Sequence, residues 1–213
     1  YGAEAGYALQ GYGRMGTGGR QPIAYAGPPP YRRPNSELPG RRPVVAVLDT
    51  GCGAHPWLDK VVTKRVLLDG IPIGYTDDAT DPERYGDQAG PLDGGIDVLA
   101  GHGTFICGLV HQACPDADIL SIRVVPSATP VVESDWVDAL TQVTELARRH
   151  RDGEPGGMPI DVVAIAMGYY HETPEDEQFD PTVLELLRVL GECGTAVVCS
   201  AGNDATKRQM FPA

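Results

Sequence analysis

The stretch VVAVLDTGCGAHPWLD, residues 44–59, is a run of apolar residues that ends on an aspartate. The run from Val44 to Leu48 is continuous, which is typical of a strand covered on both faces. Asp49 follows directly, and Gly51 and Gly53 then break the chain. Because ligands of parallel α/β sheets bind at the carboxyl ends of the strands, this stretch predicts a carboxylate at a functional edge.

The chain beyond this stretch alternates between helix-like and strand-like segments. The spacing of apolar residues predicts helices over 102–113, 133–150 and 181–190, the last with Pro181 in its first turn. Apolar runs predict further strands over 117–125, 160–168 and 194–203. Such alternation indicates an α/β fold, a doubly wound parallel sheet with helices on both faces.

Residues 1–42 differ from the rest, being rich in Gly, Pro, Tyr and Arg without a hydrophobic period. They predict an extended arm or linker before a single domain over 43–213. A formal G-x-G-x-x-G motif occurs at Gly11, Gly13 and Gly16. It binds phosphates only where it follows a strand and opens a helix, so no dinucleotide site is expected here.

The overall composition excludes some classes of partner. The 213 residues carry a net charge of -12, which disfavours non-specific binding to nucleic acid. No run of apolar residues is long enough to predict a membrane-spanning helix. The chain starts at Tyr1 without a signal peptide, so we expect it to begin inside a longer product. Its five cysteines, an odd number, favour a reducing compartment such as the cytoplasm.

Two groups of residues leave a metal ion as an alternative. Cys107, His111 and Cys114 share one face of the predicted helix, where they are either core residues or incomplete metal ligands. The acidic segment 69–98 is either a solvated loop or a structural Ca²⁺ site. No other cofactor is expected.

A histidine opens the helix predicted over 102–113, in the stretch GHGTFICGLV, residues 101–110. The positive end of a helix dipole disfavours charge on His102, so we expect a neutral ring available as a base. Gly101 and Gly103 would let another segment approach closely. A histidine that merely caps the helix is the alternative interpretation.

A side-chain amide follows the last predicted strand, in the stretch CSAGND, residues 199–204. Asn203 would present its N–H₂ group at the carboxyl edge, where it can stabilise an oxyanion. An ordinary turn asparagine is the alternative.

Taken together and in this order, the three stretches resemble the aspartate, histidine and oxyanion-asparagine motifs of the subtilisin-like serine proteases, the subtilases. The resemblance covers about residues 43–213. It implies that Asp49 orients the ring of His102, that His102 serves as general base and acid, and that Asn203 donates to the oxyanion. It implies further that Ala166, Met167 and Gly168 occupy the place of the family's Ser-Leu-Gly strand, whose backbone pairs with an extended polypeptide substrate.

The family's nucleophile is the residue that this sequence lacks. In subtilases the serine lies in a Gly-Thr-Ser-Met-Ala-Xaa-Pro stretch, and no Gly-Thr-Ser occurs among these residues. One interpretation is a serine endopeptidase whose sheet is incomplete at the C-terminal end, with the serine supplied by a remaining C-terminal protease segment. The other is a pseudoprotease, a catalytically inactive binding or scaffolding module.

Overall fold

A five-stranded parallel sheet forms the centre of the molecule. The computed structural model describes residues 27–88, 96–97, 99–126, 131–170, 180–202 and 210–212. The strands lie in the order β2-β5-β1-β6-β7, and every neighbouring pair is parallel. Their bounds are β1 Val44–Asp49, β2 Val62–Thr63, β5 Asp118–Arg123, β6 Val162–Ile165 and β7 Ala196–Cys199. A separate antiparallel pair joins β3 Leu67–Leu68 to β4 Ile71–Pro72.

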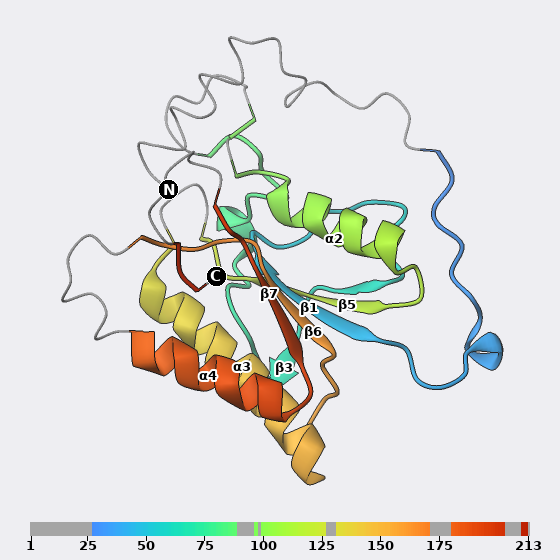
Figure 1. Cartoon of the computed structure of the whole chain (residues 1–213). Helices are drawn as coiled ribbons and strands as arrows, with labels where there is room; N and C mark the ends of the chain where they lie inside the picture. The colour runs from blue at the N-terminus through green and yellow to red at the C-terminus, as the bar shows by residue number, and fades with distance from the viewer. Residues whose placement is uncertain are drawn as a thin grey trace.

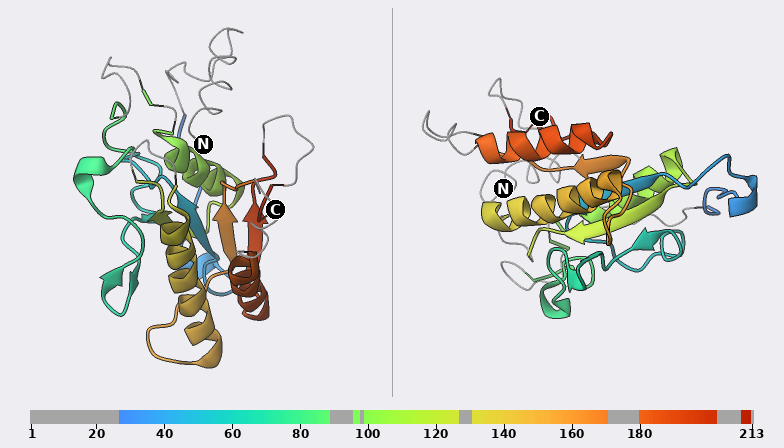
Figure 2. Two further views of the ribbon diagram at one scale, coloured as in Figure 1. Left: turned by 90° about the vertical axis from the view of Figure 1, so that its left-hand side faces the viewer. Right: turned by 90° about the horizontal axis from the view of Figure 1, so that it is seen from below.

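Helices cover both faces of the sheet, as the sequence predicts. Helix α2 (His102–Ala113) lies on one face, over β1 and β5, whereas α3 (Glu133–Asp152) and α4 (Asp180–Glu192) lie side by side on the other (Figures 1 and 2). Two short 3-10 helices, Asn35–Glu37 and Asp78–Thr80, lie in connecting segments. The described elements therefore form the α/β arrangement expected of a doubly wound sheet.

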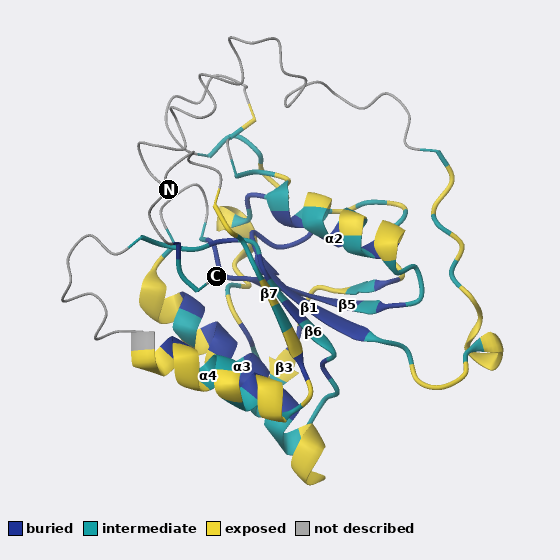
Figure 3. Cartoon of the chain, viewed as in Figure 1, coloured by how far each residue is buried: buried dark blue, intermediate teal, exposed yellow. Residues whose placement is uncertain are grey.

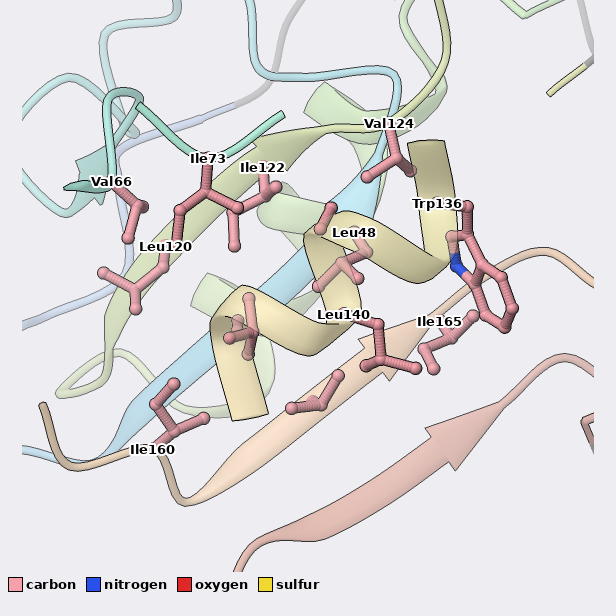
Figure 4. Packing of buried hydrophobic residues seen from close by; sticks show 14 of the residues in the cluster. Leu48, Val66, Ile73, Leu120, Ile122, Val124, Trp136, Leu140, Ile160 and Ile165 are labelled. Atoms are coloured by element: carbon pink, nitrogen blue, oxygen red, sulfur yellow. The ribbon is translucent and has the colours of Figure 1, made fainter. Parts of the chain in front are cut away.

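The main core fills the space between the sheet and α3. Leu48 of β1, Leu140 of α3 and Ile165 of β6 are each at most 1% exposed, and Figure 4 shows them packed against one another with Trp136 beside them. Figure 3 shows that the central strands are buried while the outer sides of the helices are exposed. Burying a side chain of this size contributes on the order of 1.5–3 kcal/mol, so this layer fixes the position of β1 and its terminal aspartate.

The strands are shorter than the apolar runs that predict them. The run 160–168 contains only a four-residue strand, Val162–Ile165, and the run 194–203 contains only Ala196–Cys199. Met167 shows the reason, because it is 8% exposed and belongs to the core although it lies beyond the strand. An apolar run reports burial, which continues past the last hydrogen-bonded residue.

The face of the sheet under α2 changes from buried to exposed across the strands. Val47 of β1 pairs with Ala164 of β6, which pairs with Val198 of β7, so the three share one face. Val47 is 1% exposed beneath α2, whereas Val198 is 59% exposed. Among the described residues, α2 therefore leaves the β7 side of this face uncovered.

Arginines attach the described part of the N-terminal arm, residues 27–42, to the amino edge of the sheet. Arg32 donates to the carbonyl of Pro115 at 3.1 Å and pairs with Asp118, the first residue of β5. Arg33 pairs with Asp116 at 2.8 Å. At the amino end of β6, on the other side of β1 from β5, Arg41 pairs with Asp161 at 2.6 Å. These exposed and half-buried ion pairs lie at the opposite edge of the sheet from Asp49.

Within the described segments, no helix is long and apolar enough to cross a membrane.

Candidate active site

A carboxylate and an imidazole meet at the carboxyl edge of the sheet. Asp49 is the last residue of β1 and is 2% exposed, and His102 is the first residue of α2. The ring Nδ1 of His102 lies 2.8 Å from Oδ1 and 3.0 Å from Oδ2 of Asp49. The backbone N–H of Thr50 also donates to Asp49 Oδ1, at 2.7 Å. The side chain of His102 is 41% exposed, so the ring joins a buried carboxylate to the surface.

The contact determines the charge preference of the histidine. The hydrogen bond with Asp49 raises the pKa of His102 above its usual 6.5, although burial acts in the opposite direction. The expectation of a ring whose charged form is disfavoured is therefore wrong, because the pKa of His102 is raised. A carboxylate at hydrogen-bond distance stabilises the imidazolium, and this effect exceeds that of burial.

The two motifs approach one another through glycine. We call residues 49–53 the aspartate segment and residues 102–104 the histidine segment. A Cβ atom at Gly103 would collide with the carbonyl oxygen of Gly51, so only glycine permits this packing. Gly101 has a different role from the one expected, because nothing lies within 4 Å of a Cβ placed there. Its φ of 84° instead requires a residue that tolerates the left-handed region.

Comparison with known proteins identifies the family of this chain. The model of the Subtilase family, peptidase S8, matches residues 40–213. This chain belongs to the subtilase family. Among curated proteins, none matches the sequence of this subtilase.

Two solved structures resemble the subtilase domain. Proteases from Pseudoalteromonas arctica PAMC 21717 share 22% identity with it over 81% of this chain and 53% of theirs, with a TM-score of 0.48. MycP1 with its N-terminal propeptide removed shares 19% identity over 78% of this chain and 46% of its own, with a TM-score of 0.37. The subtilase chain thus spans about half the length of each of these structures.

A glutamate from the acidic loop enters the site of the subtilase domain. Glu83 accepts hydrogen bonds from the hydroxyls of Thr50 and Thr104 and from the backbone N–H of Gly103, the last at 3.2 Å. Burial raises the pKa of Glu83, while the hydrogen bonds that it accepts act in the opposite direction. The sequence alone gave no reason to select Glu83 among the acidic residues of 69–98, because no motif surrounds it.

The segment predicted to bind substrate follows β6 at the same edge of the sheet. The side chain of Met167 packs into the core, and Ala166 and Gly168 on either side of it are half-buried. A Cβ atom at Gly168 would meet the carbonyl oxygen of Phe211. The next residue, Tyr169, pairs antiparallel with Phe211 through hydrogen bonds of 2.9 and 2.8 Å. The pairing of the segment with a polypeptide substrate stays a prediction.

The remaining candidates divide between described and undescribed residues. Asn203 lies outside the described residues, as does the G-x-G-x-x-G motif at Gly11, Gly13 and Gly16, whereas β7 brings the chain to the carboxyl edge at Cys199. In the described part of the chain, no group of three or more His, Cys, Asp or Glu side chains is arranged to hold a metal ion. Of the three residues considered as metal ligands, Cys107 and His111 are buried in α2 and Cys114 is half-buried.

Proposed function

We propose that this subtilase is a serine endopeptidase in which Asp49 and His102 form two members of a catalytic triad. The contact of 2.8 Å between His102 Nδ1 and Asp49 Oδ1 carries the proposal. A buried carboxylate that accepts from Nδ1 fixes the tautomer of the ring, leaving Nε2 free to accept a proton. The exposed side of the ring is where a nucleophile and a substrate can reach it.

The proposed reaction uses His102 twice. Its Nε2 takes the proton of a serine hydroxyl as the oxygen attacks the scissile carbonyl, and Asp49 stabilises the resulting imidazolium. The same proton then passes to the leaving amine, and a water molecule repeats the sequence to release the acyl group. Because only neutral His102 is a base, kcat/KM is expected to fall as the pH drops through its raised pKa.

Two further groups complete the proposed site. The side-chain amide of Asn203 donates to the oxyanion of the tetrahedral intermediate. The backbone of Ala166, Met167 and Gly168 pairs with an extended polypeptide substrate at the carboxyl edge of β6. Both roles come from the resemblance to subtilases, and the course of β6 and β7 toward this edge supports them.

We place the serine in polypeptide outside residues 1–213. Ser121 is 3% exposed within β5, and Ser134 lies in the first turn of α3. The Oγ atom of Ser200 accepts from the N–H of Gly202 at 3.3 Å, as a turn residue does. The uncovered β7 side of the sheet, where Val198 is 59% exposed, supports a further segment packing there.

The test is labelling of the product of the complete reading frame with a fluorophosphonate probe, which reacts with activated serines. We expect the wild-type protein to be labelled and His102→Ala to lose the label, because the serine then has no base. His150→Ala, at an exposed position near the end of α3, is the matched control and should label as the wild type does. A folded wild-type protein that is not labelled would contradict the protease and favour the pseudoprotease, a module that binds peptide without cleaving it.

A further inference from the structure

We propose that Glu83 is a positioning residue that locks the aspartate segment and the histidine segment of the site to one another. The proposal rests on the proposed function of Asp49 and His102, and it adds a residue from a loop that belongs to neither motif. Glu83 lies between them in the chain, 34 positions after Asp49 and 19 before His102.

The hydrogen bonds around Glu83 form a reciprocal pattern. The N–H of Gly103, in the histidine segment, donates to Thr50 Oγ1 at 2.8 Å, and the N–H of Gly53, in the aspartate segment, donates to Thr104 Oγ1 at 2.7 Å. Each threonine hydroxyl then donates to a different oxygen of Glu83. Each segment thus supplies a donor to the other, and both chains of hydrogen bonds end on one carboxylate.

The pattern requires a group that only accepts hydrogen bonds. A threonine hydroxyl has one proton, and here its oxygen already accepts from a backbone N–H. The proton of Thr104 must therefore point toward Glu83, whereas the hydroxyl of Thr50 has Asp49 Oδ1 at 3.1 Å as a second acceptor besides Glu83. An ionised carboxylate accepts at both oxygens. A glutamine would place an N–H₂ group against one of the two hydroxyls and break that half of the pattern.

The loop that carries Glu83 is itself attached to the sheet. Arg123, the last residue of β5 and the partner of Asp49 across the strands, donates from its guanidinium to the carbonyl of Asp77 at 2.7 Å. Its backbone carbonyl accepts from the N–H of Tyr75 at 2.8 Å, and its guanidinium lies 5.8 Å from the ring centre of Tyr75. Arg123 is only 6% exposed. The position of Glu83 is therefore set by the strand next to β1.

Glu83 also acts on the proton-transfer group through its charge. His102 faces the carboxylate of Asp49 from β1 and that of Glu83 from the loop, and both raise its pKa. Asp49 also acts on Glu83, because its like charge is one of the causes that raise the pKa of Glu83. Removing the charge of Glu83 while keeping its shape should therefore lower the pKa of His102.

The test is the Glu83→Gln variant of the complete gene product, measured as kcat and KM across pH on a peptide substrate. We expect kcat to fall about tenfold with KM unchanged, as follows from the loss of one hydrogen bond to a charged group. The acidic limb of kcat/KM should move to lower pH. Glu83→Asp retains the charge but shortens the side chain, so kcat should fall while the acidic limb stays in place. Asp78→Asn, with a side chain that is 78% exposed on the same loop, is the control and should change neither.

A second readout does not depend on cleavage. The ring signal of His102 is followed by NMR during pH titration of the 213-residue chain, with His102→Ala used to assign it. A lower pKa in Glu83→Gln supports the proposal even if the complete product proves inactive, in which case the protease proposal alone fails. If neither the ring titration nor the acidic limb moves in Glu83→Gln, the proposal is overturned. If Glu83→Gln does not fold, the variants Thr104→Val and Thr104→Ser are compared instead. Only the serine variant keeps the hydroxyl that donates to Glu83, so its kcat should be the higher of the two. Equal kcat in these two variants would likewise overturn the proposal.

Discussion

The carboxyl edge of the sheet has two ends that differ in how completely they are built. At the end formed by β1 and β5, Asp49 is 2% exposed and is linked by hydrogen bonds to Thr50 and His102. At the end formed by β6 and β7, Val198 is 59% exposed and Cys199 is half-buried. At the first end the buried carboxylate is paired and the strand residues are covered, whereas the second end presents an exposed strand residue within the described part of the chain.

This difference separates two tasks of the proposed reaction. Proton transfer needs a carboxylate and a ring held within a few tenths of an ångström, and the loops around β1 supply that without any other polypeptide. We propose that the substrate binds and the serine is supplied at the β6–β7 end, where Val198 of the sheet is exposed. Substitutions at the two ends should therefore differ in kind, and three tests examine the comparison.

The largest expected effect is on the pair at the first end. Asp49→Asn should lower kcat of the complete gene product by about 10⁴-fold, because an amide donor favours the wrong tautomer of His102. The free energy of unfolding should change little, since the side chain keeps its shape. Asp59→Asn, an exposed residue shortly after the aspartate segment, is the control. A loss of less than tenfold for Asp49→Asn would contradict the role assigned to it.

A smaller effect is expected for Asn203, the residue proposed to stabilise the oxyanion. Asn203→Leu should lower kcat by about 10²–10³-fold with little change in KM, because an oxyanion forms only after the attack. The measurement is steady-state kinetics on the same peptide as for Asp49→Asn. A proportional rise of KM with unchanged kcat would show that Asn203 binds the ground state, which removes it from the oxyanion site.

The smallest effect concerns packing on one face of the sheet. Replacing valine by threonine keeps the shape and adds a hydroxyl, which costs about 1–3 kcal/mol where no hydrogen bond compensates. Val47→Thr, beneath α2, should lower the free energy of unfolding of the 213-residue chain by that amount. Val198→Thr should change it by less than about 0.5 kcal/mol, because the hydroxyl meets solvent. Urea unfolding measures both, and equal costs would refute the contrast between the two ends.

The sequence predicted the order of the elements and the layers of the fold. Helix α2 has the bounds that its apolar spacing indicated, with Gly101 in the left-handed region before it and Cys114, which precedes Pro115, after it. The strand beginning at Val44 was also evident, since a strand buried on both faces leaves a continuous apolar run. The rule that parallel strands place their carboxyl ends at one edge predicted the place of Asp49, whereas its contact with His102 was implied by the resemblance to the subtilase motifs.

The electrostatics of the site and the role of Glu83 were not predictable in this way. Sequence position suggested that the helix dipole would control His102, whereas the distance to Asp49 decides the direction of its pKa. Glu83 reaches the site because Arg123 holds the loop that carries it, through the carbonyl of Asp77. Neither this contact nor the hydrogen bond from Thr104 to Glu83 follows a periodic pattern along the chain. Contacts made by an irregular loop depend on its path in space, which local patterns do not encode.

The arginine pairs of the N-terminal arm separate two responses to ionic strength. They lie at the amino edge, a full strand of six residues from Asp49, or about 20 Å away. Exposed ion pairs weaken in concentrated salt, whereas a buried pair is screened much less. Raising the salt concentration should thus loosen the arm, while the pairing of His102 with Asp49 persists. An optical or isotopic reporter attached to the arm would detect its release, and the catalytic rate should not change.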